Sequence, residues 1–156
     1  HWAKKNRNLI ANLIMDYFIS KGYVELKQND WAFESVHNYI GDDNIIRKRV
    51  IAAYEGQKCI ISLSMRDGVL ICISKGHVEW NCSAPHGAGR IEPDFQKYQL
   101  ERLCQFYAGN LYGMRERRKD ESPMMYKSKE EIIRNISEKV SVMNEIESVY
   151  NFKVAG

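Results

Sequence analysis

The stretch Cys59–Ile73, CIISLSMRDGVLICI, decides the fold class. It contains two short runs rich in β-branched and apolar residues, Cys59–Ser64 and Val69–Ile73, which are typical of strands. The pair Asp67-Gly68 lies between the runs, and a glycine after an acidic residue suits a hairpin turn that needs positive φ. The stretch therefore predicts two antiparallel strands joined by a tight turn.

Two further runs of the same kind precede this stretch. Ala32–Ile40 and Arg49–Tyr54 are rich in β-branched and aromatic residues, and Glu55-Gly56 supplies turn residues before the next run. The four runs together predict an antiparallel meander.

Helical patterns lie on both sides of the predicted strands. Apolar residues recur at helical spacing over Trp2–Lys21, and Gly22 can end this helix in the left-handed conformation. A second helix is expected over Pro93–Phe106, and Ser128 can cap a last helix over Lys129–Asn144. We therefore expect an α+β fold in which an antiparallel sheet is flanked by helices.

Length and composition limit the classes of protein to which the chain can belong. The chain has 156 residues, 44% of them apolar and 28% charged, which is enough for one globular core. We expect one domain, or a fragment of one, over residues 1–156. The net charge of +3 is too small to indicate nucleic-acid binding by itself. No apolar run reaches the roughly 20 residues of a membrane-spanning helix.

Cysteine usage and the amino-terminus bear on location and processing. The four cysteines form no CxxC pair, and no apolar signal region precedes them. These features favour reduced thiols and a cytoplasmic location. A first residue His1 in place of Met indicates a processed or truncated product.

The segment Ser83–Arg90, SAPHGAGR, carries the strongest chemical signal. Glycines allow backbone N–H groups to approach an anion closely, and Arg90 can bind phosphate oxygens through two parallel hydrogen bonds. A neutral imidazole at His86 can attack a phosphorus atom and form a phosphoramidate. The residues alone leave a second interpretation open, a glycine-rich turn with a surface histidine.

Four motifs in register resemble the RtcB family of RNA ligases. The resemblance extends from Asn6-Arg7 to the terminal Tyr150–Lys153, and it corresponds to the C-terminal portion of the family's fold. The motifs are Glu34–Tyr39 (ESVHNY), Ser64–Gly68 (SMRDG), Ser83–Arg90 (SAPHGAGR) and Asp120–Lys127 (DESPMMYK).

The resemblance implies a GTP- and manganese-dependent ligase. Such an enzyme joins RNA ending in a 2′,3′-cyclic phosphate or 3′-phosphate to RNA beginning with a 5′-hydroxyl, in tRNA splicing or RNA repair. The family's guanylylated histidine falls on His86, and its manganese ligand in the His-Asn-Tyr motif falls on His37. Nucleotide-binding positions carried over in the same way are Asn38, Ser62, Leu63, Ser64, Met65, Gly87, Ala88, Gly89, Arg90, Tyr126 and Lys153.

The resemblance also implies that the metal site is incomplete in this chain. The family's other manganese ligands, an acidic residue, a cysteine and two histidines, belong to an N-terminal portion that this sequence does not match. We therefore expect the isolated chain to be inactive as a ligase and to need that portion as a partner.

An alternative is a catalytically incompetent nucleotide- or RNA-binding module derived from such a ligase. Val69 stands where the family usually has a serine that binds the nucleotide phosphate, and Glu92 and Asp94 place negative charge near a phosphate site. Arg49 and Val50 replace a usual Gly-Ala pair.

A third interpretation is a structural zinc site. The residues Cys72, His77, Cys82 and His86 span 15 positions and have the side chains that zinc prefers, although their spacing fits no common zinc knuckle.

Overall fold

The computed structural model describes residues 2–23, 33–91 and 123–148 and divides into two units, His1–Phe33 and Glu34–Gly156. The predicted helix Pro93–Phe106 and the site residue Lys153 lie outside the described residues, as do Glu92 and Asp94.

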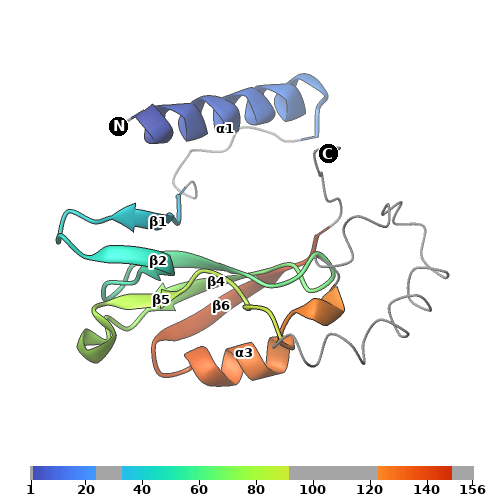
Figure 1. Ribbon diagram of the computed structural model, residues 1–156. Helices are drawn as coiled ribbons and strands as arrows, with labels where there is room; N and C mark the ends of the chain where they lie inside the picture. The colour runs from blue at the N-terminus through green and yellow to red at the C-terminus, as the bar shows by residue number, and fades with distance from the viewer. Residues whose placement is uncertain (1, 24–32, 92–122, 149–156) are drawn as a thin grey trace. The chain divides into compact units, whose positions relative to one another are not determined.

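The first unit contains helix α1, Trp2–Ser20 (Figure 1). Gly22 has a φ of +69°, the Gly22 N–H donates to the Ile19 carbonyl (2.9 Å), and the Tyr23 N–H donates to the Phe18 carbonyl (3.0 Å). These bonds satisfy carbonyls at the end of the helix, so the predicted glycine cap is confirmed. No helix in the described ranges is long and apolar enough to cross a bilayer.

In the part of the second unit that the structure describes, two antiparallel sheets and helix α3 are present, which confirms the α+β class. The first sheet has the order β1-β2-β5 and the second has the order β3-β4-β6 (Figure 1). The predicted strands are thus divided between two sheets instead of forming one continuous meander. Their bounds are β1 His37–Ile40, β2 Ile46–Ala52, β3 Lys58–Ser62, β4 Val69–Ser74, β5 Ser83–Pro85 and β6 Val140–Ile146.

The β3–β4 hairpin forms as the quoted stretch predicts. Cys59 pairs with Cys72, and Ile61 pairs with Leu70, and all four side chains are buried. Gly68 has a φ of +73°, and a Cβ on it would collide with the carbonyl of Ile146 in the neighbouring strand. Glycine is therefore required in this turn both for its backbone conformation and for its lack of a side chain.

Helix α3, Lys129–Ile136, packs against the buried face of this hairpin. Ile132 and Ile136 of the helix belong to the same buried cluster as Ile61 and Leu70. Burying a side chain of this size contributes roughly 1.5–3 kcal/mol, so this cluster stabilises the packing of helix α3 on the hairpin. The Oγ of Ser128 accepts a hydrogen bond from the Glu131 N–H (3.2 Å), which confirms the predicted cap.

The predicted end of this last helix is wrong. The helix stops at Ile136, and Val140–Ile146 forms strand β6 along β4. Val140 is buried, and Met143 is 59% exposed. The β-branched Val140 and Val142 suit a strand, and pairing with the edge of β4 satisfies the backbone groups that a longer helix would have bonded internally.

The predicted boundaries of the first two strands are also shifted. Residues 33–36 are not in a strand, and β1 is limited to His37–Ile40. Strand β2 begins at Ile46, three residues before the predicted Arg49, and ends at Ala52. The earlier start brings the charged segment 47–49 into the sheet, where Arg47 pairs with Tyr39 of β1.

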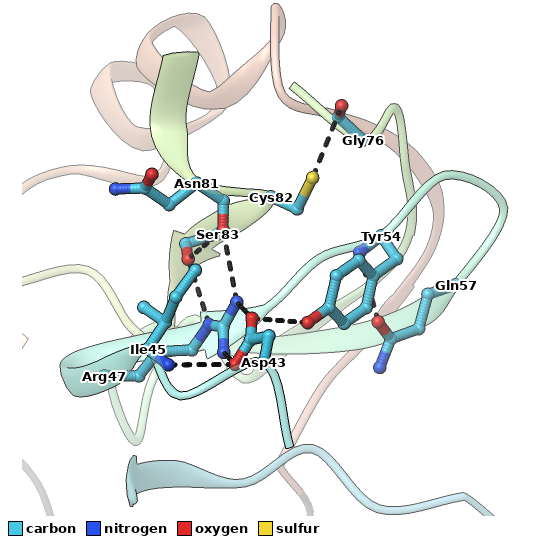
Figure 2. A network of polar contacts seen from close by, with 9 residues as sticks. All are labelled: Asp43, Ile45, Arg47, Tyr54, Gln57, Gly76, Asn81, Cys82 and Ser83. Carbon is cyan, nitrogen blue, oxygen red and sulfur yellow. Dashed lines mark hydrogen bonds and ion pairs between the residues drawn. The ribbon is translucent and has the colours of Figure 1, made fainter. Parts of the chain in front are cut away.

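A buried arginine fastens the first sheet to the turn before β5 (Figure 2). Only 1% of Arg47 is exposed, and its guanidinium donates to both carboxylate oxygens of Asp43 at 3.0 and 2.6 Å. It also donates to the Oγ of Ser83 (3.0 Å) and to the Asn81 carbonyl (3.1 Å). The Tyr54 hydroxyl donates to Asp43 at 2.5 Å. Because each charged atom has a partner, the guanidinium can be buried.

The pKa of Asp43 gives this network a pH dependence. Hydrogen bonds from Arg47 and then from Tyr54 hold the pKa of the Asp43 carboxyl well below its usual value. A lowered pKa in the folded state means that the stabilisation is fully present above the unfolded pKa of about 3.9 and is lost as the pH falls toward the folded pKa.

We therefore predict that Asp43→Asn lowers the free energy of unfolding most at neutral pH. The difference from the parent should narrow as the pH falls below about 4, because the Asp43 carboxyl then binds a proton in the unfolded parent while it stays ionised in the folded parent, so the parent loses stability that Asp43→Asn never had. Urea unfolding of both proteins between pH 7 and pH 3 measures this difference. Asp42→Asn, which removes the exposed neighbouring carboxylate, is the control. An Asp43→Asn difference that is equal at pH 7 and pH 3 contradicts the prediction.

Candidate functional site

The segment that follows β5 lies between two other parts of the second unit. At the end of β3, the Ser62 N–H donates to the His86 carbonyl (3.0 Å), and the Ala88 N–H donates to the Ser62 carbonyl (2.9 Å). On the other side, the Lys127 N–H donates to the Gly89 carbonyl (3.2 Å). These bonds hold the His86–Arg90 backbone in place against both neighbours.

Gly87 is needed where this segment meets β3. A Cβ on Gly87 would lie 2.9 Å from the Ser62 carbonyl oxygen, closer than a side chain can approach without displacing the backbone. Gly89 is required for another reason, because its φ is +72° and it has open space around it. Gly87 is therefore required because a side chain would clash, and Gly89 is required because its backbone is left-handed.

The two histidines of the predicted site come together. The ring centroids of His37, the first residue of β1, and His86 are 4.3 Å apart, with 43° between the ring planes. They are 49 residues apart in the sequence, and the sheet order β1-β2-β5 brings them to the same side. The structure thus places the predicted nucleophile beside the predicted metal ligand.

The orientation of the His86 ring follows from one hydrogen bond. Its Nδ1 lies 2.7 Å from the Arg49 carbonyl oxygen. A carbonyl can only accept, so in the neutral ring the proton is on Nδ1 and the lone pair is on Nε2. A half-buried imidazole held in this way presents Nε2 as a nucleophile.

The Arg49 carbonyl is directed toward His86 by an irregularity in the first sheet. His37 pairs with Ile51 and Tyr39 pairs with Arg47, so four steps along β2 match two steps along β1. Such bulges often redirect groups next to functional sites. Within this bulge Asn38 and Arg49 both have left-handed backbones, with φ of 59° and 62°, and the Arg49 N–H donates to Asn38 Oδ1 (2.7 Å).

Arg49 is a site residue that sequence reasoning did not assign. The available signal was its position in the family pattern, where a glycine is usual, because a φ of 62° is the conformation in which glycine is favoured. What the sequence could not show is that the carbonyl of this residue contacts His86.

The predicted nucleotide-binding residues 62–65 lie at the end of β3 and in the hairpin turn. Ser62 is exposed, whereas Leu63 and Ser64 are buried, and the Ser64 hydroxyl donates to Asp67 at 2.7 Å. Leu63 and Ser64 therefore have only backbone groups to offer to a ligand, while Met65 is half-buried.

The remaining predicted nucleotide-binding residues lie along the glycine-rich segment. Arg90 forms an isolated bridge with Tyr126, and the Ile91 N–H donates to the Met125 carbonyl (2.9 Å). The structure therefore brings Tyr126 next to Arg90, although about 35 residues separate them in the sequence. Lys153 lies outside the described residues.

The metal-binding capacity of the described residues is limited. His37 supplies one imidazole, but no group of three or more His, Cys, Asp or Glu side chains converges within the described ranges. These residues do not by themselves fit a manganese centre. The zinc interpretation is wrong, because Cys72 is fully buried opposite Cys59 and does not converge with His77, Cys82 and His86.

We predict that Gly87→Ala weakens the contact between the histidine segment and β3. The new Cβ must displace the Ser62 carbonyl, and overpacking of this kind costs about 1–3 kcal/mol. Urea unfolding measures the loss, and hydrogen exchange of the Ala88 amide should accelerate because its acceptor moves. Gly56→Ala, where the added Cβ meets no atom within 4 Å, is the control for exchange of the Ala88 amide. Unchanged stability and Ala88 exchange in Gly87→Ala contradict the steric role.

Comparison with known proteins agrees with this arrangement of motifs. A family model described as tRNA-splicing ligase RtcB matches residues 1–154, which is essentially the whole chain. A search of the curated proteins gave no match. Because the family match covers both the His37 and the His86 segments, the chain belongs to the RtcB family of RNA ligases.

Proposed function

We propose that this chain supplies the histidine nucleophile and the nucleotide-binding segments of a GTP- and manganese-dependent RNA ligase. The ligase joins a 3′-phosphate or 2′,3′-cyclic phosphate end to a 5′-hydroxyl end. The observation that carries the proposal is the contact between His86 Nδ1 and the Arg49 carbonyl, because it leaves Nε2 free to accept GMP.

The first chemical step is transfer of GMP to His86. The Nε2 lone pair attacks the α-phosphorus of GTP, an N–P bond forms, the bond to the bridging oxygen breaks, and pyrophosphate leaves. Nδ1 keeps its proton, and the positive charge that develops on the ring is stabilised by the Arg49 carbonyl. An oxygen of the RNA 3′-phosphate then attacks the same phosphorus, and the N–P bond to His86 breaks. The 5′-hydroxyl attacks the RNA phosphorus and displaces GMP, and a 2′,3′-cyclic phosphate is first opened by water to a 3′-phosphate.

The nucleotide is proposed to bind along the glycine-rich segment 87–90. Gly89 is exposed and has open space around it, and Arg90 supplies positive charge for phosphate oxygens. Asn38 Oδ1 is already engaged by Arg49, so the Asn38 amide NH₂ is the group that can donate to a phosphate. Tyr126, beside Arg90, and Lys153 are proposed for the guanine.

Manganese requires ligands beyond those described. His37 is proposed as one imidazole ligand, and an N-terminal portion of the family fold is proposed to supply the others. When bound, manganese neutralises triphosphate charge and assists departure of pyrophosphate.

One observation favours the module interpretation as a second candidate. Val69 pairs directly with Ser62 across the β3–β4 hairpin, so it lies beside a predicted nucleotide-binding residue and has no hydroxyl to offer. A module would bind GTP without forming a covalent adduct.

We predict that His86→Ala abolishes GMP attachment and largely preserves GTP binding, because alanine lacks the nucleophilic nitrogen. Radiolabelled GTP and manganese are added to the chain mixed with the N-terminal portion of an RtcB ligase, and acid-labile label on the protein is counted. His77→Ala removes a histidine outside the site and should retain the adduct. An adduct of parental stoichiometry in His86→Ala contradicts the assignment, and GTP binding without any adduct in the parent supports the module.

We also predict that the chain alone does not join RNA. With His37 as the one proposed ligand, manganese binds weakly and leaves the triphosphate charge uncompensated. Joining of a 3′-phosphate RNA to a 5′-hydroxyl RNA is assayed with GTP and manganese, with and without the N-terminal portion. Robust joining by the chain alone contradicts this account, and His1 and His77 are then the first residues to substitute.

A further inference from the structure

We propose that Asn38 is a positioning residue for His86, and that it acts through the backbone of Arg49. The inference rests on the proposed function, because it explains how His86 is oriented so that Nε2 is the reactive nitrogen. This role is separate from contact with the nucleotide. The Oδ1 of Asn38 binds the Arg49 N–H, and the NH₂ group of the same amide is proposed to bind the nucleotide.

Two hydrogen bonds on either side of the Arg49 Cα carry the inference. The Arg49 N–H donates to Asn38 Oδ1 at 2.7 Å, and the Arg49 carbonyl accepts from His86 Nδ1 at 2.7 Å. The bond to Asn38 holds the peptide group that contains the Arg49 N–H. The bond from His86 is made to the next peptide group, which contains the Arg49 carbonyl. With the N–H held by Asn38, a rotation about the Arg49 N–Cα bond turns the carbonyl away from His86, whose backbone N–H also donates to it at 3.5 Å.

The Arg49 backbone needs such a restraint. Its φ of 62° is left-handed, a conformation that is disfavoured for a residue with a side chain. The hydrogen bond from the Arg49 N–H to Asn38 Oδ1 offsets part of this cost. Asn38 itself has a φ of 59°, which asparagine tolerates better than most residues.

The ring contact with His37 does not replace this restraint. Stacking at 4.3 Å limits where the His86 ring lies, but it does not determine which nitrogen carries the proton. The Arg49 carbonyl does determine it, because only a protonated Nδ1 can donate to it. The tautomer of His86 is therefore the observable that separates positioning from a merely structural role.

Three asparagine variants make the test specific. Asn38→Gly keeps the left-handed backbone accessible and removes the acceptor. Asn38→Asp keeps an acceptor oxygen but loses the NH₂ donor, so it separates positioning of His86 from nucleotide binding. Asn44→Gly is the matched control, because Asn44 has a φ of 60° and is exposed in the turn between β1 and β2.

The experiment reads the tautomer of His86 in the 156-residue chain by ¹⁵N NMR of the histidine rings. It is recorded at about pH 8, where an ordinary imidazole is neutral, with His86→Ala used for assignment. The parent, Asn44→Gly and Asn38→Asp should show the Nδ1-protonated form, and Asn38→Gly should show a mixture with the Nε2-protonated form. With the N-terminal portion, GTP and manganese added, GMP attachment in Asn38→Gly should slow by about three- to tenfold.

The outcomes distinguish the two proposals. If Asn38→Gly keeps the parental tautomer, the positioning role is overturned whatever its rate of GMP attachment, because loss of the Asn38 NH₂ alone can slow attachment, and the proposed function stands. If the tautomer changes in Asn38→Gly but the parent forms no GMP adduct, the positioning role stands and the proposed function fails. A tautomer change of equal size in Asn44→Gly overturns the positioning role, because it attributes the effect to the added glycine.

Discussion

The buried guanidinium of Arg47 is the interaction on which the first sheet and the candidate site depend. It binds Asp43 before β2, and Asn81 and Ser83 at the start of β5 (Figure 2). Since β5 leads into His86 and β2 carries Arg49, the same side chain holds the two segments that meet at the nucleophile. A buried charge is stable only with every donor satisfied, so this constraint fixes the positions of all its partners.

Three strands, β1, β2 and β3, contribute the contacts around His86. The bulge in β2 directs the Arg49 carbonyl to Nδ1, β1 places the His37 ring against the imidazole, and the end of β3 bonds the backbone on either side of Gly87. None of these contacts comes from a residue adjacent to His86 in the sequence. Preorganisation of a nucleophile by fixed neighbours of this kind reduces the reorganisation that the reaction requires.

The candidate site was predictable from sequence to the extent that its residues form continuous motifs. The HGAG segment and the His-Asn-Tyr motif are local patterns, and their glycine and histidine identities indicate phosphate chemistry. The contribution of Arg49 could not be found in this way, because it is made by a backbone carbonyl, and every residue has one. Leu63 and Ser64 were assigned as binding residues, but their burial could be known only from the packing of the hairpin.

The sequence by itself determined the features that rest on local interactions: the β3–β4 hairpin with its Asp67-Gly68 turn, the glycine end of α1 and the serine cap of α3. These depend on backbone conformations and hydrogen bonds within a few residues. Tertiary structure decided that Val140–Ile146 is a strand, that the predicted meander is divided between two sheets, and that Arg49 faces His86. Each of these depends on a partner distant in the sequence, because a strand edge or a carbonyl acquires its role only from the group that packs against it.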